Sequence, residues 1–95
     1  MFIVLLRFST NKADAGQYLQ EHQAWVDRGV EDGVFLLVGS IQPGLGGAIL
    51  ASDESLDAVK RRVDQDPFVE QDVVSAEILE IEPARANERL AFLMS

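Results

Sequence analysis

The apolar positions of this chain form two kinds of pattern, continuous runs of strand length and repeats at helical spacing. The continuous runs predict four strands, over Phe2–Phe8, Val34–Ile41, Gly47–Ala51 and Val73–Glu82. The repeats at helical spacing predict one helix over Asn11–Val30 and a second that ends at Asp66. The predicted order of elements is therefore strand, helix, strand, strand, helix, strand.

Turn and capping residues separate these runs. Ser9–Asn11 supplies the chemistry of a helix start, and Gln42–Gly44 predicts a turn that joins two strands into a hairpin. Asp66 ends the second helix because the residue before a proline is pushed out of the helical region. Pro83 opens a tail that we expect to be helical over Ala84–Met94. We therefore expect a single domain over residues 1–95, with a core of residues 1–83 and a tail of residues 84–95.

This order of elements predicts an α+β, ferredoxin-like βαββαβ fold. Its four-stranded antiparallel sheet carries both helices on one face, and right-handed crossovers place the first strand inside the sheet. The first, second and fourth strands are apolar on both faces; in the first, Ile3 and Leu5 oppose Phe2, Val4 and Leu6. Two helices cover only one face. We therefore expect a second copy to cover the other, in a homodimer packed sheet against sheet.

Composition narrows the function classes. The chain has 8 Lys and Arg against 16 Asp and Glu, a formal net charge of −8, which argues against binding to nucleic acid or to an anionic membrane. It has no cysteine, and its opening apolar run is too short for a signal sequence or a membrane span. We expect a cytoplasmic protein. One histidine among scattered carboxylates lacks a metal-ligand set, so we expect no metal and no cofactor.

His22 is the only histidine, and it lies in the middle of the apolar stripe of the first predicted helix. A buried imidazole needs a hydrogen-bond partner or a cavity to open onto. Asp66, held beside Pro67 at a helix end, is the candidate partner, and together they would form a pair for general acid/base chemistry. Two plainer interpretations stay open: a structural core histidine for His22, and a turn-forming role for Asp66.

Four further residues are candidates for contact with a ligand. Ser40 ends the second strand beside the turn, where its hydroxyl could bind a ligand or only cap the strand. Trp25 and Phe68 are core residues first and possible walls for a flat organic ligand second. Arg7 is a polar position in an apolar strand, where it could project into a cavity or lie at a rim.

Four stretches of this chain together resemble a known family: His22–Trp25, Gly33–Ser40, Gly46–Ala51 and Asp66–Phe68. In their order and spacing they resemble the YCII-related (YciI-like) family of the dimeric α+β barrel superfamily, from Met1 to about Pro83. The resemblance implies an active-site pair of His22 and Asp66 with Ser40 as a third member. Relatives also carry an arginine shortly before the histidine; here Gln17–Glu21 occupies that stretch, which leaves Arg7 as the nearest substitute.

The favoured hypothesis is a small-molecule enzyme of isomerase, lyase or hydrolase type, in which His22 and Asp66 act on a small, possibly cyclic organic substrate. The alternative is a non-catalytic metabolite-binding or accessory protein that uses the same pocket. A haem-binding protein with His22 as axial ligand ranks lower, because the neighbouring Trp25 and Tyr18 leave little room for a porphyrin. A dimeric scaffold with a structural histidine is the fourth possibility.

Overall fold

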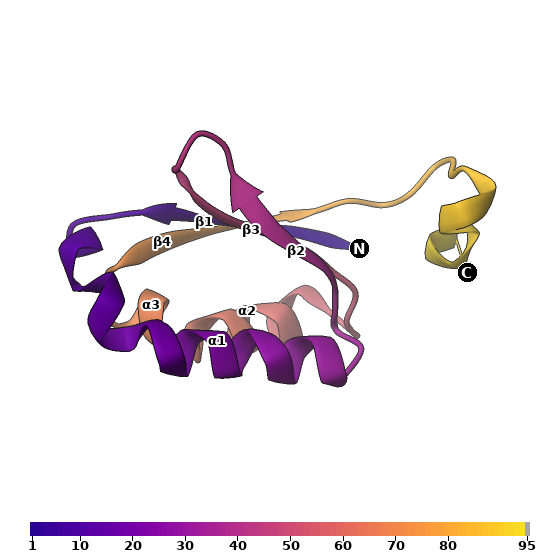
Figure 1. Ribbon diagram of the computed structural model, residues 1–95. Coiled ribbons are helices and arrows are strands. Elements are labelled where there is room, and N and C mark those ends of the chain that lie inside the picture. Colours follow the sequence, from indigo (N-terminus) through magenta and orange to yellow (C-terminus); the bar gives the residue numbers. More distant parts are fainter. Residues whose placement is uncertain (95) are drawn as a thin grey trace.

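Strands and helices form two layers in the computed structural model, which describes residues 1–94, with the sheet above and the helices below in Figure 1. The strands are β1 (Phe2–Phe8), β2 (Phe35–Ile41), β3 (Gly46–Ala51) and β4 (Val74–Glu80). The α-helices are α1 (Ala15–Glu31), α2 (Leu56–Asp64) and α3 (Pro67–Glu70). Two 3₁₀ segments complete the described chain, η1 (Lys12–Asp14) and η2 (Glu88–Met94).

The sheet is four-stranded and antiparallel, in the order β2-β3-β1-β4. The first strand therefore lies inside the sheet, as predicted. All the α-helices lie on one face (Figure 1). The predicted α+β, ferredoxin-like class is confirmed, with the short α3 as an addition that the sequence did not predict.

The helix boundaries follow from capping. α2 begins after Ser55, whose Oγ accepts a hydrogen bond from the Ala58 backbone N–H at 3.1 Å. α3 begins after Asp66, with Pro67 in the first helical turn, where its missing N–H costs nothing. The first predicted helix is divided, because η1 precedes α1.

The core lies between the sheet and the helices. Alternate residues of β1 point into it; the side chains of Phe2, Val4 and Leu6 are 3% exposed or less. α1 approaches the sheet most closely at Gly29, where an added Cβ would lie 2.1 Å from Cδ2 of Phe35. This close contact anchors the C-terminal half of α1 against β2.

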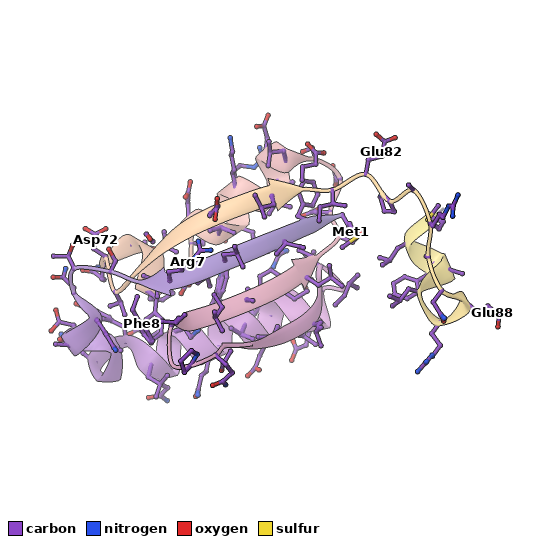
Figure 2. The ribbon with its side chains drawn as sticks, turned by 90° about the horizontal axis from the view of Figure 1, so that it is seen from above. Met1, Arg7, Phe8, Asp72, Glu82 and Glu88 are labelled. Carbon is purple, nitrogen blue, oxygen red and sulfur yellow. The ribbon has the colours of Figure 1, made fainter. Side chains whose placement is uncertain are left out.

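The opposite face of the sheet is apolar and bears no helix. Figure 2 looks onto this open face, which carries Ile3, Leu5, Leu37, Leu50 and Leu79 from all four strands. Leu37 is 67% exposed and Leu79 is 42% exposed. The prediction that strands are apolar on both faces is therefore confirmed in the monomer.

The C-terminal tail differs from its prediction. Met1 and Ile81 exchange backbone hydrogen bonds of 2.8 and 3.1 Å, and beyond them the chain leaves the body and runs outward (Figure 1). Helical structure begins only at Glu88, later than the expected Ala84, and it is of the 3₁₀ type. None of the residues in this segment is buried, so little packing offsets the cost of helix nucleation.

Within residues 1–94, no helix is long and apolar enough to cross a membrane. The cytoplasmic location stays a prediction.

Candidate active site

A pocket of about 510 Å³ lies between the middle of α1 and the ends of β1, β2 and β3. His22 lines it from the helix side, Ser40 lines it from β2, and Phe68 contributes a wall from α3. The site is therefore assembled from segments that are distant in the sequence.

Residue size explains why the pocket lies at this end of α1. Ser40 pairs with Gly47, and Gly47 pairs with the buried Leu6, so the three residues share the helix-facing side of the sheet. The hydroxymethyl group of Ser40 and the hydrogen of Gly47 leave space beneath the sheet there. At the other end of α1, the ring of Phe35 fills the equivalent space against Gly29.

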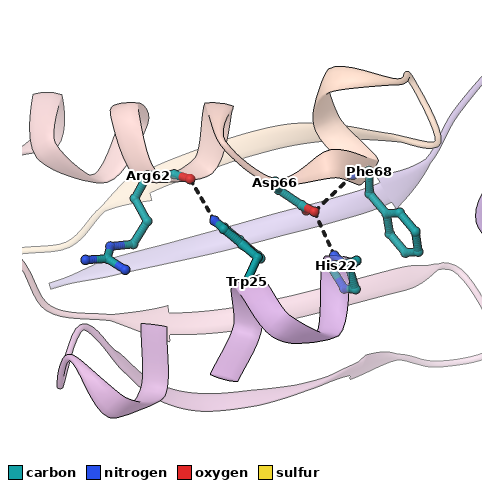
Figure 3. Close-up of polar contacts among 5 residues, drawn as sticks. All are labelled: His22, Trp25, Arg62, Asp66 and Phe68. Atoms are coloured by element: carbon teal, nitrogen blue, oxygen red, sulfur yellow. Dashed lines mark hydrogen bonds and ion pairs between the residues drawn. The ribbon is translucent and has the colours of Figure 1, made fainter. Parts of the chain in front are cut away.

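His22 and Asp66 are in direct contact, as expected. His22 Nδ1 lies 2.7 Å from Asp66 Oδ1 (Figure 3). The same Oδ1 accepts a hydrogen bond from the backbone N–H of Phe68 at 3.0 Å. The Asp66 side chain is fully buried, whereas the side chain of His22 is 18% exposed. The pair is thus anchored at its carboxylate and open at its imidazole.

The hydrogen-bond pattern assigns the tautomer of His22. An ionised carboxylate only accepts, so the proton of a neutral His22 is on Nδ1. Nε2 then presents a lone pair, and it has no hydrogen-bond partner among residues 1–94. Because His22 lines the pocket, this arrangement suits proton transfer to or from a bound molecule.

The second carboxylate oxygen of Asp66 is unusual. Oδ2 is buried and has no hydrogen-bond partner in the described chain. A buried carboxylate loses its hydration, so the carboxylate of Asp66 is stabilised by the two hydrogen-bond donors at Oδ1. One of those donors is His22.

Phe68 holds the imidazole in place. The two rings stack with centroids 4.0 Å apart and an interplanar angle of 5°. The side of His22 that faces α3 is therefore covered by hydrocarbon. Phe68 also lines the pocket, as expected for a ligand wall.

Trp25 and Arg7 lie away from the pocket, in contrast to the expectation that they contact ligand. Trp25 is 1% exposed, and its Nε1–H donates to the backbone carbonyl of Arg62 at 2.9 Å (Figure 3). A stripe only constrains which helix face is buried, and Trp25 lies on the half of it that faces α2. Arg7 alternates with Leu6 along β1, so its side chain projects from the open face of the sheet, where it pairs with Glu77 at 2.8 Å.

Two further polar residues line the pocket that the sequence did not single out, Gln23 and Asp27 of α1. At about 100° per residue they lie roughly 100° and 140° around the helix from His22, so both lie outside the apolar stripe. Leu19 and Val26, which also line the pocket, lie on the same side of His22. The apolar stripe was therefore correctly placed, but it gave no indication that the polar residues outside it line the pocket.

Within residues 1–94, no group of three or more His, Asp or Glu side chains is arranged to hold a metal ion.

Comparison with known proteins identifies the family. The profile of the YCII-related domain matches residues 1–82. The chain belongs to the YCII-related domain family. This finding confirms the resemblance noted in the sequence, and the match contains both members of the His22–Asp66 pair of this YCII-related protein.

A solved structure is similar in fold. It is a 5-chloro-2-hydroxyhydroquinone dehydrochlorinase from Burkholderia phenoliruptrix AC1100, in complex with 2,5-dihydroxybenzoquinone. The TM-score is 0.69 at 15% sequence identity, over 86% of this chain and 94% of the other. At this identity the similarity shows the fold. No curated protein matches the chain.

Proposed function

We propose that this YCII-related protein is a small-molecule enzyme in which His22 is the general acid/base and Asp66 is the residue that orients it. The observation that carries the proposal is the 2.7 Å contact between a pocket-lining imidazole and a fully buried carboxylate. The comparisons support a small-molecule enzyme as well, because the chain belongs to the YCII-related family and a structure similar in fold is a dehydrochlorinase.

The expected chemistry is of isomerase, lyase or hydrolase type on a small, possibly cyclic organic substrate. In an isomerisation, Nε2 accepts a proton from one substrate atom and returns it to another. In an elimination, Nε2 accepts the proton while the leaving group departs as an anion with the bonding electrons. Neither step needs an oxidant or a reductant, and either can be accelerated about 10²–10⁴-fold by a positioned acid/base group.

Asp66 and Phe68 act through His22. Asp66 stabilises the imidazolium that forms when Nε2 takes a proton, and keeps Nδ1 as a donor. Phe68 restricts ring rotation by stacking on it. Ser40, on the sheet side of the pocket, is placed to hydrogen-bond a bound molecule.

Proton exchange on an electron-rich ring tests the proposal. 1,2,4-Trihydroxybenzene exchanges ring hydrogen for deuterium through its keto tautomer: a base removes a hydroxyl proton, an acid delivers a deuteron to a ring carbon, and the reverse steps release the original ring proton. We expect the protein to accelerate this exchange in D₂O under argon, followed by ¹H NMR. His22→Gln should slow the catalysed exchange about 10²–10⁴-fold.

Glu21→Gln is the matched control, because Glu21 is the neighbour of His22 on α1, is exposed and does not line the pocket. The control should exchange the probe at the wild-type rate. Equal rates in wild type and His22→Gln would refute the acid/base role. Saturable binding of the probe with no acceleration by the wild type would support the non-catalytic binding protein instead.

We further propose that the protein works as a homodimer through the open face of the sheet. The exposed Leu37 and Leu79 and a shallow apolar groove beside Ile3 and Leu50 support this, because a bare apolar face of this kind favours association. The matching surface on a second copy is apolar in the same way, as a two-fold interface requires.

Light scattering after size-exclusion chromatography tests the dimer. Leu37→Asp should convert it to a monomer, because a charge would be buried at the interface. Val30→Asp is the control, since Val30 is 51% exposed but lies on the helix layer. A dimer that survives Leu37→Asp would place the interface elsewhere.

A further inference from the structure

The polar side chains of the pocket have no partners within the protein. Ser40, Gln23 and Asp27 line the cavity, and no hydrogen bond or ion pair joins their side chains to another described residue. Some polar side chains elsewhere have such partners: Ser55 caps α2, Asn11 donates to the Gln71 carbonyl, and Asn87 accepts from the Arg89 backbone N–H. The hydrogen-bonding capacity at the pocket is therefore available to a bound molecule.

The acceptors among these groups restrict the ligand. The carboxylate of Asp27 only accepts hydrogen bonds, and Nε2 of a neutral His22 also accepts. Gln23 and Ser40 can donate or accept, so they adapt to either kind of partner. A ligand that satisfies the pocket must therefore present hydrogen-bond donors at more than one position.

Charge restricts the ligand further. The residues that line the pocket include the acid Asp27 and no Lys or Arg. Arg7 is committed to Glu77 on the other face of the sheet. Lys12 lies beside the pocket wall: its Nζ is 4.7 Å from the ring centroid of Phe8, on an exposed side chain. With a net charge of −8 on the whole chain, the pocket disfavours an anion.

We propose that this pocket selects an uncharged, polyhydroxylated ring, and that Asp27 is the residue that rejects anionic analogues. The apolar walls, Phe8 and Phe68 among them, contact the ring, while Asp27 and His22 Nε2 accept hydrogen bonds from its hydroxyl groups. This inference rests on the proposed function, because it takes the same pocket as the substrate site. It adds the substrate class and a specificity residue.

Three para-disubstituted benzenes separate the requirements: hydroquinone, 1,4-dimethoxybenzene and 4-hydroxybenzoate. The first has two hydroxyl donors, the second has none, and the third replaces one hydroxyl by a carboxylate. Binding is measured by titration of the full chain, followed by its backbone amide NMR signals under argon. We expect hydroquinone to bind about three- to tenfold more tightly than 1,4-dimethoxybenzene, because each hydrogen bond contributes modestly. 4-Hydroxybenzoate should also bind more weakly than hydroquinone.

Asp27→Asn tests the specificity role. It should reduce the preference for hydroquinone over 4-hydroxybenzoate about two- to fivefold, the range expected for a partly solvated charge. Glu31→Gln removes the same charge from an exposed position one turn further along α1, outside the pocket, and should leave the ratio unchanged.

Several results would overturn the inference. These are equal binding of hydroquinone and 1,4-dimethoxybenzene, tighter binding of 4-hydroxybenzoate, equal shifts in Asp27→Asn and Glu31→Gln, and no response of the pocket signals to any probe. The proposed function has a separate readout, the deuterium exchange lost in His22→Gln. Exchange without hydroxyl selectivity would refute only the ligand class, whereas selectivity without exchange would refute only the catalytic role.

Discussion

Two hydrogen bonds join α1 to the segment at the end of α2, and they serve different purposes. Trp25 donates to the backbone carbonyl of Arg62 at 2.9 Å, and His22, almost one turn earlier, contacts the side chain of Asp66 at 2.7 Å. Both donors are rings on the same apolar stripe. The Trp25 contact leaves no polar group for a ligand, because the indole has one N–H and its ring is buried. The His22 contact leaves a second ring nitrogen facing the pocket.

The difference shows how one packing arrangement supports both a core and a site. On the Trp25 side, Gly29 lets α1 lie directly against the ring of Phe35. On the His22 side, Ser40 and Gly47 are too small to fill the same gap. The contacts of Trp25 and Gly29 hold α1 in position, so that the imidazole of His22 is fixed relative to the pocket. The following substitutions separate these two sides.

Trp25→Ala should have the largest effect on stability. Removing this buried ring leaves a cavity in the core, and we expect the free energy of unfolding to fall by about 3–5 kcal/mol. Denaturant titration measures the change. If the loss were below about 1 kcal/mol, as for a surface substitution, the packing around Trp25 would not be what holds α1 in position.

Gly29→Ala should have the next largest effect. Its Cβ would lie 2.1 Å from Cδ2 of Phe35, so the helix must move away from β2. We expect a loss of about 1–3 kcal/mol in unfolding free energy. Gly16→Ala is the matched control, because Gly16 also lies in α1 and an added Cβ there meets nothing within 4 Å. The control should be neutral or stabilising.

His22→Leu distinguishes a required polar pair from a replaceable one. Leucine preserves apolar packing against Phe68 but removes one of the two donors at the buried Asp66. We expect a loss of about 1–2 kcal/mol in denaturant titration, because the carboxylate is left less satisfied. The scaffold hypothesis predicts the opposite, a variant as stable as the wild type or more so.

Asp66→Asn should affect stability least and function more. The amide oxygen of asparagine can accept both hydrogen bonds that Oδ1 accepts now, so the unfolding free energy should change by less than about 1 kcal/mol. Deuterium exchange on 1,2,4-trihydroxybenzene should slow about 10–100-fold, as is typical when the partner that orients a functional imidazole is lost. An unchanged exchange rate would show that Asp66 is structural only.

Local patterns along the chain predicted much of the fold. The apolar runs located all four strands to within a few residues, and the order of the elements correctly placed the first strand inside the sheet. Asp66 was also found from local chemistry, since a carboxylate before a proline is held at a helix end. The tail was less predictable, because apolar spacing after Pro83 indicates a helix only if something packs against it.

The site was only partly visible in the sequence. Its central pair was predicted as a contact, whereas Trp25 and Arg7 were placed at a ligand from their residue types and lie elsewhere. Gln23 and Asp27 were not predicted as pocket residues because they lie outside the apolar stripe. Which side of the apolar stripe of α1 faces a cavity depends on the side chains of the sheet that lie against it, and the sequence of the helix does not contain them.

The amino-acid pattern was enough to specify the elements, their order and the apolar character of both sheet faces, because these depend on spacing along the chain. The meeting of His22 with Asp66 and the space beside Gly47 arise from the packing of α1 against the sheet. Such contacts join residues far apart in sequence, and their geometry is set by the volumes of the side chains that the fold brings together.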